Sequence, residues 1–148
     1  MKETLIKERF LVRSYREEDF ESVATLWKIT GMGDPERGDN AETIMNTIRS
    51  GGNLLILMEK SSGSIAGTSW LTFDGRRIFL HHFGILPQYQ GNGLSKYLLK
   101  ESLRFVRESG HQVKLEVHSS NIKAIKLYET FGFKPLGEYL VYIIRDVP

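Results

Sequence analysis

Hydrophobic and polar positions change their period several times along the chain, and each change marks a predicted element. A short strand is expected at 10–14. Apolar residues then recur at helical spacing and place Phe20 and Trp27 on one face of a helix. Ser14 and Glu17 have the spacing of a capping box that opens this helix. The first part of the chain is therefore predicted to be a strand followed by a structural helix.

A second helix is predicted after a turn-rich stretch at 31–38. Asp39 or Asn40 starts it, and its apolar stripe includes Ile44 and Ile48. Two consecutive glycines, 51 and 52, end the helix because glycine favours turns over helix interiors.

Three strand-like stretches follow, at 53–59, 65–73 and 77–86. The last two are separated by Asp74-Gly75, a dipeptide typical of tight hairpin turns. The short separations predict that the three strands form an antiparallel meander.

The second half returns to helical spacing. A long buried helix is expected from Gly93 to Gly110, then a strand at 113–117 and a helix at 121–131. A last strand is expected at 138–145, where β-branched and aromatic residues predominate. Its central part, 139–144, is apolar on both faces, so it is either covered within the monomer or pairs with a second subunit in a homodimer.

The predicted element order is β-α-α-β-β-β-α-β-α-β, an α/β fold with helices packed on a mixed sheet. The length of 148 residues, 41% of them hydrophobic, suits one domain spanning 1–148 with a real core. Gly, Ser and Pro residues are dispersed, and they form no linker.

Charge and cysteine content exclude several function classes. A net charge of +2 gives no basic field for nucleic acid or an acidic membrane. Because the chain has no cysteine, disulfides, thiolate zinc sites and a cysteine nucleophile are excluded, and a cytoplasmic location is compatible. Residues 1–12 carry no secretory signal pattern, and no apolar run has the roughly 18 residues of a membrane span.

A glycine-rich turn, Gln90-Gly91-Asn92-Gly93-Leu94-Ser95, lies between a predicted strand and the long helix. Backbone N–H groups at the start of a helix can hold a phosphate. The same glycines also serve merely to form the turn. The residues after Gly93 exclude a Walker loop, and Lys96 stands where a dinucleotide fingerprint needs glycine.

The turn resembles the acetyl-CoA motif of the GCN5-related N-acetyltransferases (GNAT), Arg/Gln-x-x-Gly-x-Gly/Ala. Gln90 takes the first place and Gly93 the fourth, whereas Ser95 departs from the usual last residue but is still small. The segment 115–133 is similar to the family's Asn-x-x-Ala-x-x-Leu-Tyr-Glu-x-x-Gly-Phe motif. The resemblance implies a mostly antiparallel sheet, flanked by helices and splayed between its fourth and fifth strands.

The resemblance also implies acetyl-CoA as acetyl donor. The strand ending at 83–85 would bind the pantetheine arm through its backbone, and the glycine turn with Lys96 would hold the phosphates. Asn121 would bond the amide arm, although it also fits an N-cap. The residues so assigned are Phe83, Gly84, Ile85, Gln90, Gly91, Asn92, Gly93, Leu94, Ser95, Lys96 and Asn121.

By resemblance, Tyr128 is the general acid that protonates the departing thiolate. Its alternative role is core filling, because it shares a helical stripe with Ala124 and Phe131.

Two residues are candidates for the general base, and both rest on resemblance. Glu116 matches the base of ribosomal-protein N-terminal acetyltransferases, although Lys114, Glu116 and His118 also fit a solvated strand face. His81 matches the base of arylalkylamine-type members. Strand alternation places His82 on the opposite sheet face, which argues against a metal site, and none is expected.

We therefore expect an N-acetyltransferase that moves acetyl from acetyl-CoA directly to a primary amine of a small molecule or peptide. A protein N-terminal or lysine acetyltransferase is the alternative within enzymes. A non-catalytic acyl-CoA-binding module is the alternative outside them, since it would keep the glycine turn without needing Tyr128 or a base.

Overall fold

The computed structural model describes all residues from 1 to 148 and contains two compact units, Met1–Glu116 and Val117–Pro148. The first unit holds the sheet and four of the α-helices, and the second holds one α-helix and the C-terminal segment.

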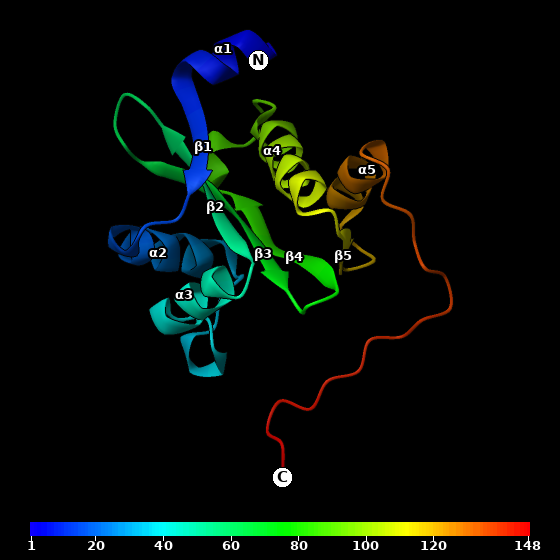
Figure 1. Cartoon of the computed structure of the whole chain (residues 1–148). Coiled ribbons are helices and arrows are strands. Elements are labelled where there is room, and N and C mark those ends of the chain that lie inside the picture. The colour runs from blue at the N-terminus through cyan, green and yellow to red at the C-terminus, as the bar shows by residue number, and fades with distance from the viewer. The chain divides into compact units, whose positions relative to one another are not determined.

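The first unit is built on a five-stranded sheet in the order β1-β2-β3-β4-β5 (Figure 1). The strands are β1 (Phe10–Ser14), β2 (Asn53–Glu59), β3 (Ile65–Phe73), β4 (Arg77–Ile85) and β5 (Gln112–Leu115). The first four pair antiparallel, and β5 pairs parallel with β4. This confirms the predicted mixed, mostly antiparallel sheet.

The sheet opens between β4 and β5. The β5 strand pairs with β4 only from Arg77 to Leu80, so the second half of β4 continues without β5 beside it. The predicted splay between the fourth and fifth strands is therefore present.

Helices cover both faces of the sheet (Figure 1). The helices of the first unit are α1 (Glu3–Arg9), α2 (Phe20–Thr30), α3 (Ala41–Arg49) and α4 (Leu94–Ser109), with 3₁₀ turns at Glu17–Asp19, Pro35–Arg37 and Pro87–Tyr89. The second unit contains α5 (Ile122–Thr130). The α1 helix has no counterpart in the sequence-based expectations. Gly110 ends α4 at a φ of 76°, as its position predicts.

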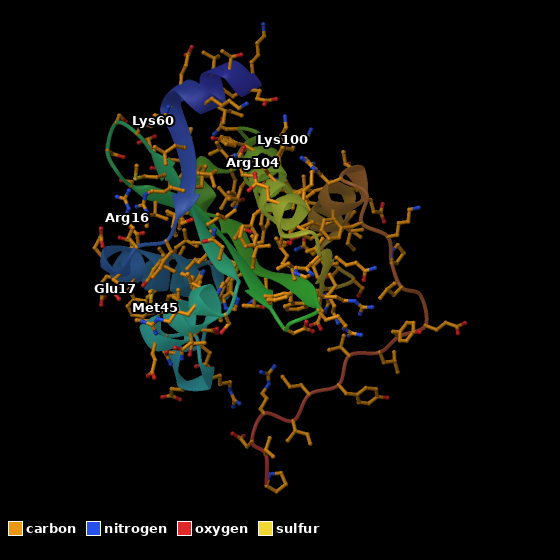
Figure 2. The ribbon with its side chains drawn as sticks, in the orientation of Figure 1. Arg16, Glu17, Met45, Lys60, Lys100 and Arg104 are labelled. Atoms are coloured by element: carbon orange, nitrogen blue, oxygen red, sulfur yellow. The ribbon has the colours of Figure 1, made fainter.

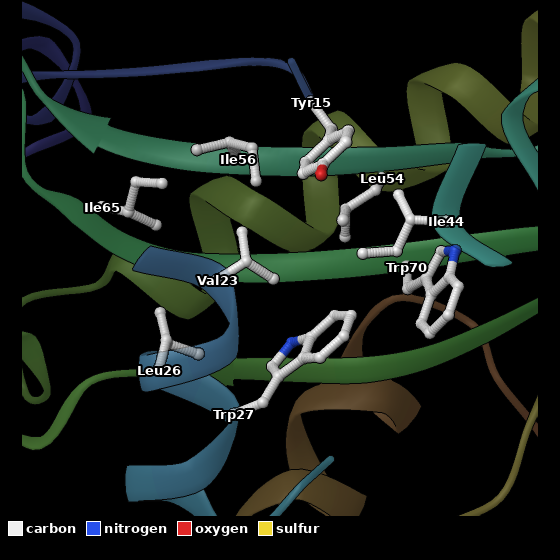
Figure 3. Packing of buried hydrophobic residues seen from close by; sticks show 9 residues of the cluster. All are labelled: Tyr15, Val23, Leu26, Trp27, Ile44, Leu54, Ile56, Ile65 and Trp70. Atoms are coloured by element: carbon white, nitrogen blue, oxygen red, sulfur yellow. The ribbon is translucent and has the colours of Figure 1, made fainter. Parts of the chain in front are cut away.

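Strand alternation along β3 divides the core into two sides. Trp70 stacks on Trp27 of α2 with ring centroids 5.2 Å apart, whereas the neighbouring Ser69 accepts a 2.7 Å hydrogen bond from Ser102 of α4. The α2 and α3 side carries a cluster of buried hydrophobic residues (Figure 3). Its buried members are Tyr15, Val23, Leu26, Trp27, Ile44, Leu54, Ile56, Ile65 and Trp70.

The predicted capping box of Ser14 and Glu17 is wrong, because Ser14 is still part of β1. Asp19 organises this corner instead. Its carboxylate accepts a 2.8 Å hydrogen bond from the Arg16 backbone N–H and binds the Arg13 guanidinium at 2.7 and 2.8 Å. The Arg13 hydrogen bonds are the main reason that the Asp19 pKa lies below its usual value.

The predicted strand at 138–145 is also wrong. No helix or strand follows α5, and the side chains from Tyr139 to Ile144 are 67–85% exposed. β-Branched and aromatic residues favour a strand only where neighbouring strands pair with its backbone and cover its side chains. Within the monomer this segment is not covered, so pairing with a second subunit stays a prediction.

Candidate active site

A β-bulge interrupts β4 beside its pairing with β3. His81 pairs with Trp70 and Gly84 pairs with Thr68, so two β4 residues, His82 and Phe83, lie opposite Ser69 alone. His82 has a φ of 46° and is the single non-glycine residue in the left-handed region.

The bulge brings His81 and His82 to the same side of the sheet. Their Nδ1 atoms lie 2.9 Å apart, and both rings contact Trp70, with centroid distances of 4.8 and 5.0 Å. The expectation that His82 lies on the opposite face is therefore wrong. Alternation requires a regular extended backbone, and the left-handed conformation of His82 breaks it.

The two histidines link to a polar group at each end. His82 Nε2 lies 3.2 Å from Asp39 Oδ1, although this approach falls short of hydrogen-bond alignment and leaves the buried Nε2 without another partner. At the other end, His81 Nε2 lies 3.2 Å from the Thr72 hydroxyl oxygen. Together these contacts form a continuous row, the histidine row, across the α2 and α3 side of the sheet. Its members are Asp39, His82, His81 and Thr72.

Burial controls the charge of this row. It lowers the His81 pKa to about 4, with the neighbouring His82 adding a smaller effect in the same direction. Burial also lowers the His82 pKa, and Asp39 opposes that shift. His81 is consequently neutral near pH 7 and has one ring nitrogen able to accept a proton.

Next to this row lies an open hollow of about 230 Å³ at the β3–β4 hairpin. Thr72, Phe79 and Lys114 are among its lining residues. The Phe79 ring lies 5.2 Å from the His81 ring, and the Lys114 ammonium lies 5.8 Å from the centroid of Phe79. Thr72 therefore borders the hollow and contacts His81 at the same time.

Glu116 lies just outside β5, which ends at Leu115, and its side chain is exposed. Lys114, Glu116 and His118 therefore do not share one strand face, because only Lys114 belongs to the strand. The β4–β5 pairing ends at Leu80 and Leu115, so His81 and Glu116 each directly follow the last pair.

The glycine turn has the shape of an anion cradle. Gly91 and Gly93 both have a φ of 81°, and Gly93 caps α4 without a side-chain hydrogen bond to the first helical turn. The space where a Gly91 side chain would lie is open. The uncapped N–H groups and this open space fit a pyrophosphate of acetyl-CoA.

The side chains of the other turn residues differ in exposure and in hydrogen bonding. The Gln90 amide donates a 2.9 Å hydrogen bond to the Ile85 carbonyl, so its side chain supports the turn. Leu94 is buried in the core, Ser95 is half-buried and Lys96 is exposed. Asn92 Nδ2 makes long contacts of 3.4 Å with carbonyls of the same turn.

At the end of β4, the groups open to a ligand belong to the backbone and not to side chains. Gly84 and Ile85 pair with β3 on one edge, and β5 does not reach them on the other. A side chain at Gly84 would meet the Met32 methyl at 2.7 Å, so packing against Met32 also favours glycine there. Phe83 is the bulge residue beside them.

Three basic side chains, Lys96, Lys100 and Arg104, lie one or two turns apart along α4, and two of them have acidic partners. Lys100 and Arg104 both project from α4 (Figure 2). Lys100 lies 3.1 Å from Glu3 of α1, and Arg104 pairs with Glu101 on its own helix. These pairs leave Lys96, one turn nearer the glycine cradle, as the phosphate candidate among the three.

In the second unit, Tyr128 belongs to α5 and Asn121 directly precedes this helix. The Asn121 carbonyl oxygen accepts a 3.3 Å hydrogen bond from the Ala124 N–H, which makes Asn121 the N-cap. Tyr128 is buried and meets Phe133 edge-on at 5.7 Å. Burial raises the pKa of Tyr128 to about 12, so the phenol keeps its proton near neutral pH.

Comparison with known proteins identifies the class that this fold and site define. The model of the acetyltransferase (GNAT) family matches residues 12–133, so the chain belongs to this family. It is accordingly an acetyl-CoA-dependent N-acetyltransferase, and the resemblance in its motifs is confirmed.

Solved structures of the same class share the fold. Trypanosoma brucei acetyltransferase Tb11.01.2886 is 23% identical, with a TM-score of 0.70 over 91% of this chain and 99% of that chain. AAC(6')-Iy in complex with a bisubstrate analogue is 17% identical, with a TM-score of 0.74 over 93% and 99%. The Escherichia coli ribosomal-protein-S18-alanine N-acetyltransferase is 21% identical, with a TM-score of 0.71 over 84% and 77%.

None of the helices combines the length and apolar character needed to cross a membrane.

Proposed function

We propose that this enzyme transfers acetyl directly from acetyl-CoA to a primary amine of a small molecule or peptide, with His81 as general base and Tyr128 as acid. The observation that carries the base assignment is a partly buried, neutral imidazole whose Nε2 faces the Thr72 hydroxyl at the edge of an open hollow. A chain without cysteine offers no thiol for an acetyl-enzyme intermediate, which supports direct transfer.

The reaction needs a proton acceptor because alkyl ammonium groups, with a pKa near ~10, are mostly protonated at neutral pH. The amine nitrogen attacks the thioester carbon, the N–C bond forms and the C–S bond breaks. His81 Nε2 takes the amine proton, either directly or through the Thr72 hydroxyl, which lies 3.2 Å from it.

Glu116 is the competing base. Its exposed position just after β5 is compatible with contact to an acceptor. His81 is held by aromatic neighbours on the side of the sheet that carries the hollow. This fixed orientation beside the Thr72 hydroxyl favours His81 over Glu116.

The acetyl donor is proposed to bind along the part of β4 that β5 leaves unpaired. Backbone groups of Phe83, Gly84 and Ile85 would bond the pantetheine arm, and one N–H would stabilise the oxyanion. The uncapped start of α4 at Gly93 would hold the pyrophosphate, with Lys96 nearby. Asn121 would reach the amide arm through Nδ2, since Oδ1 serves the helix cap.

Tyr128 would donate a hydrogen bond to the departing sulfur. With a pKa of about 12 against ~8.5 for a thiol, the phenol is the weaker acid, so it stabilises the thiolate more readily than it fully protonates it. Solvent or the protonated His81 would complete the proton transfer. Loss of this hydroxyl should therefore slow turnover without abolishing it.

The test is release of free CoA from acetyl-CoA, followed with a thiol reagent across polyamines, amino acids, aminoglycosides and peptides with free N-termini or lysines. Acceptor-dependent release that falls sharply in His81→Gln supports the proposal. Transfer only to protein N-termini or lysines would assign the alternative acceptor class. If acetyl-CoA binds in calorimetry and the whole panel stays inactive, the proposed acceptor class is wrong.

A further inference from the structure

We propose that Asp39 and His82 act as positioning residues that fix the tautomer of His81, so that its Nε2 presents a lone pair toward Thr72 and the hollow. The inference rests on the proposed role of His81 as base. It concerns residues that no motif of the sequence singles out for chemistry.

The contact between the two rings restricts their protons. The Nδ1 atoms of His81 and His82 lie 2.9 Å apart, a hydrogen-bond distance. In two neutral imidazoles, this contact requires that one Nδ1 carries a proton and the other accepts it. The proton position on one histidine therefore determines that on the other.

Asp39 selects between the two arrangements. Its carboxylate lies 3.2 Å from the buried His82 Nε2, which has no other polar partner. A lone pair on that nitrogen would be repelled by the nearby negative oxygen, whereas the positive end of an N–H dipole would be attracted to it even without full hydrogen-bond alignment. His82 therefore carries its proton on Nε2 and accepts through Nδ1. His81 must then carry its proton on Nδ1, which leaves its Nε2 as the acceptor.

The surrounding structure holds this arrangement in place. Asp39 Oδ2 accepts a 2.8 Å hydrogen bond from the Asp34 N–H, and the Asp39 N–H donates to the Asp34 carbonyl at 3.2 Å. His82 keeps a left-handed backbone conformation, which is strained in residues other than glycine. Strain of this kind persists where the surroundings require it, and here it places the His82 ring against His81.

The catalytic consequence follows from the protonation states. A neutral histidine with its proton on Nε2 would point an N–H at Thr72 and could not accept the amine proton there. With the proton on Nδ1, His81 Nε2 accepts a hydrogen bond from Thr72 and then a proton. The resulting imidazolium keeps its Nδ1–H bonded to His82, so no group has to rearrange during transfer.

The tautomers can be measured without an assay. Long-range ¹H–¹⁵N spectra of the histidine-labelled full chain near pH 7 distinguish Nδ1–H from Nε2–H rings, and His81→Gln and His82→Gln assign the signals. We expect His81 as the Nδ1–H tautomer and His82 as the Nε2–H tautomer. Asp39→Ala should shift both toward mixtures, whereas Asp34→Asn, which alters the same loop, should leave both unchanged. Wild-type His81 protonated on Nε2 would overturn the proposal.

Activity supplies the second readout. Asp39→Ala should lower kcat/KM for the best acceptor about 10- to 100-fold without changing acetyl-CoA affinity. Asp39→Asn should recover part of the loss, because its amide oxygen still accepts a hydrogen bond. Unchanged kcat/KM in Asp39→Ala overturns a positioning role. Unchanged kcat/KM in His81→Gln instead identifies failure of the proposed base, even where the measured tautomers are as expected.

Discussion

Thr68 donates a hydrogen bond to the carbonyl oxygen of His82 at 2.8 Å, and its hydroxyl oxygen accepts one from the Trp27 indole at 3.0 Å. Thr68 is fully buried. One hydroxyl thus joins α2, β3 and the left-handed residue of β4. The position of His82, and with it that of His81, depends on this hydroxyl.

Thr68→Val should destabilise the fold. Valine matches threonine in shape but leaves the Trp27 N–H and the His82 carbonyl without a partner inside the core, at a cost of about 2 kcal/mol. Urea unfolding followed by tryptophan fluorescence measures the loss. Thr25→Val is the matched control, because the Thr25 hydroxyl is exposed and bonds only its own helix. Equal losses in the two variants would show that the buried hydroxyl has no special role.

Gly91→Ala should lower acetyl-CoA affinity. Gly91 has a φ of 81° and open space beside it, so alanine there is strained and its methyl group projects where the phosphates are proposed to bind. Gly63→Ala is the control, since Gly63 has a φ of 72° with equally open surroundings and lies in the β2–β3 turn. Both should cost about 1 kcal/mol of stability, but only Gly91→Ala should raise the acetyl-CoA Kd in calorimetry.

Tyr128→Phe should lower kcat by about 10- to 100-fold and leave the acetyl-CoA Kd nearly unchanged. The phenyl ring keeps the buried packing against Phe133, while the hydrogen-bond donor to the thiolate is removed. Steady-state kinetics and calorimetry separate the two effects. Turnover equal to that of the parent enzyme would remove the acid assignment.

The stability of the chain should depend on the protonation of His81 in mildly acidic solution. Its folded pKa of about 4 lies below the usual 6.5, so the unfolded chain binds the proton more readily. This contribution is fully present above about pH 6.5 and is lost as pH falls toward about 4, by at most about 3 kcal/mol.

His81→Gln should therefore flatten the pH dependence of unfolding free energy over this interval. Urea titrations at several pH values across it provide the comparison, with His118→Gln, on an exposed side chain, as control. A parallel decline in His81→Gln and the parent chain would show that His81 is not held neutral by burial.

The acidic limb of kcat/KM against pH should identify the base. His81→Gln should lower kcat/KM about 100-fold and change this limb, whereas Glu116→Gln should leave its position unaltered. If only Glu116→Gln changes the limb, the exposed carboxylate is the base. If neither does, a water chain carries the proton.

Much of the fold follows from local patterns. The period of apolar residues predicts the central strands, and the motifs around Gly93 and Tyr128 indicate the family. The C-terminal strand fails as a prediction because composition at 138–145 describes a preference, while strand formation needs a partner that the monomer does not provide.

The histidine row could not be predicted for a different reason. It depends on a bulge that places two residues opposite Ser69, and no residue of the His81-His82-Phe83 sequence signals a left-handed conformation. Asp39 has the sequence pattern of a helix start, and the structure indeed begins α3 just after Asn40. Its distance to His82 depends on the turn at 35–38, which no periodicity encodes.

The early end of β5 has a consequence for how this enzyme tolerates variation. Beyond Leu80, one edge of β4 has no neighbouring strand, so its backbone N–H and C=O groups are not used by β5. An extended thioester arm could form hydrogen bonds with these groups in the way that an added strand does. Recognition of that kind does not depend on side-chain identity. Under the proposed binding mode, natural variation at the Phe83 side chain is tolerable for donor binding, while the geometry of the main chain is not free to change.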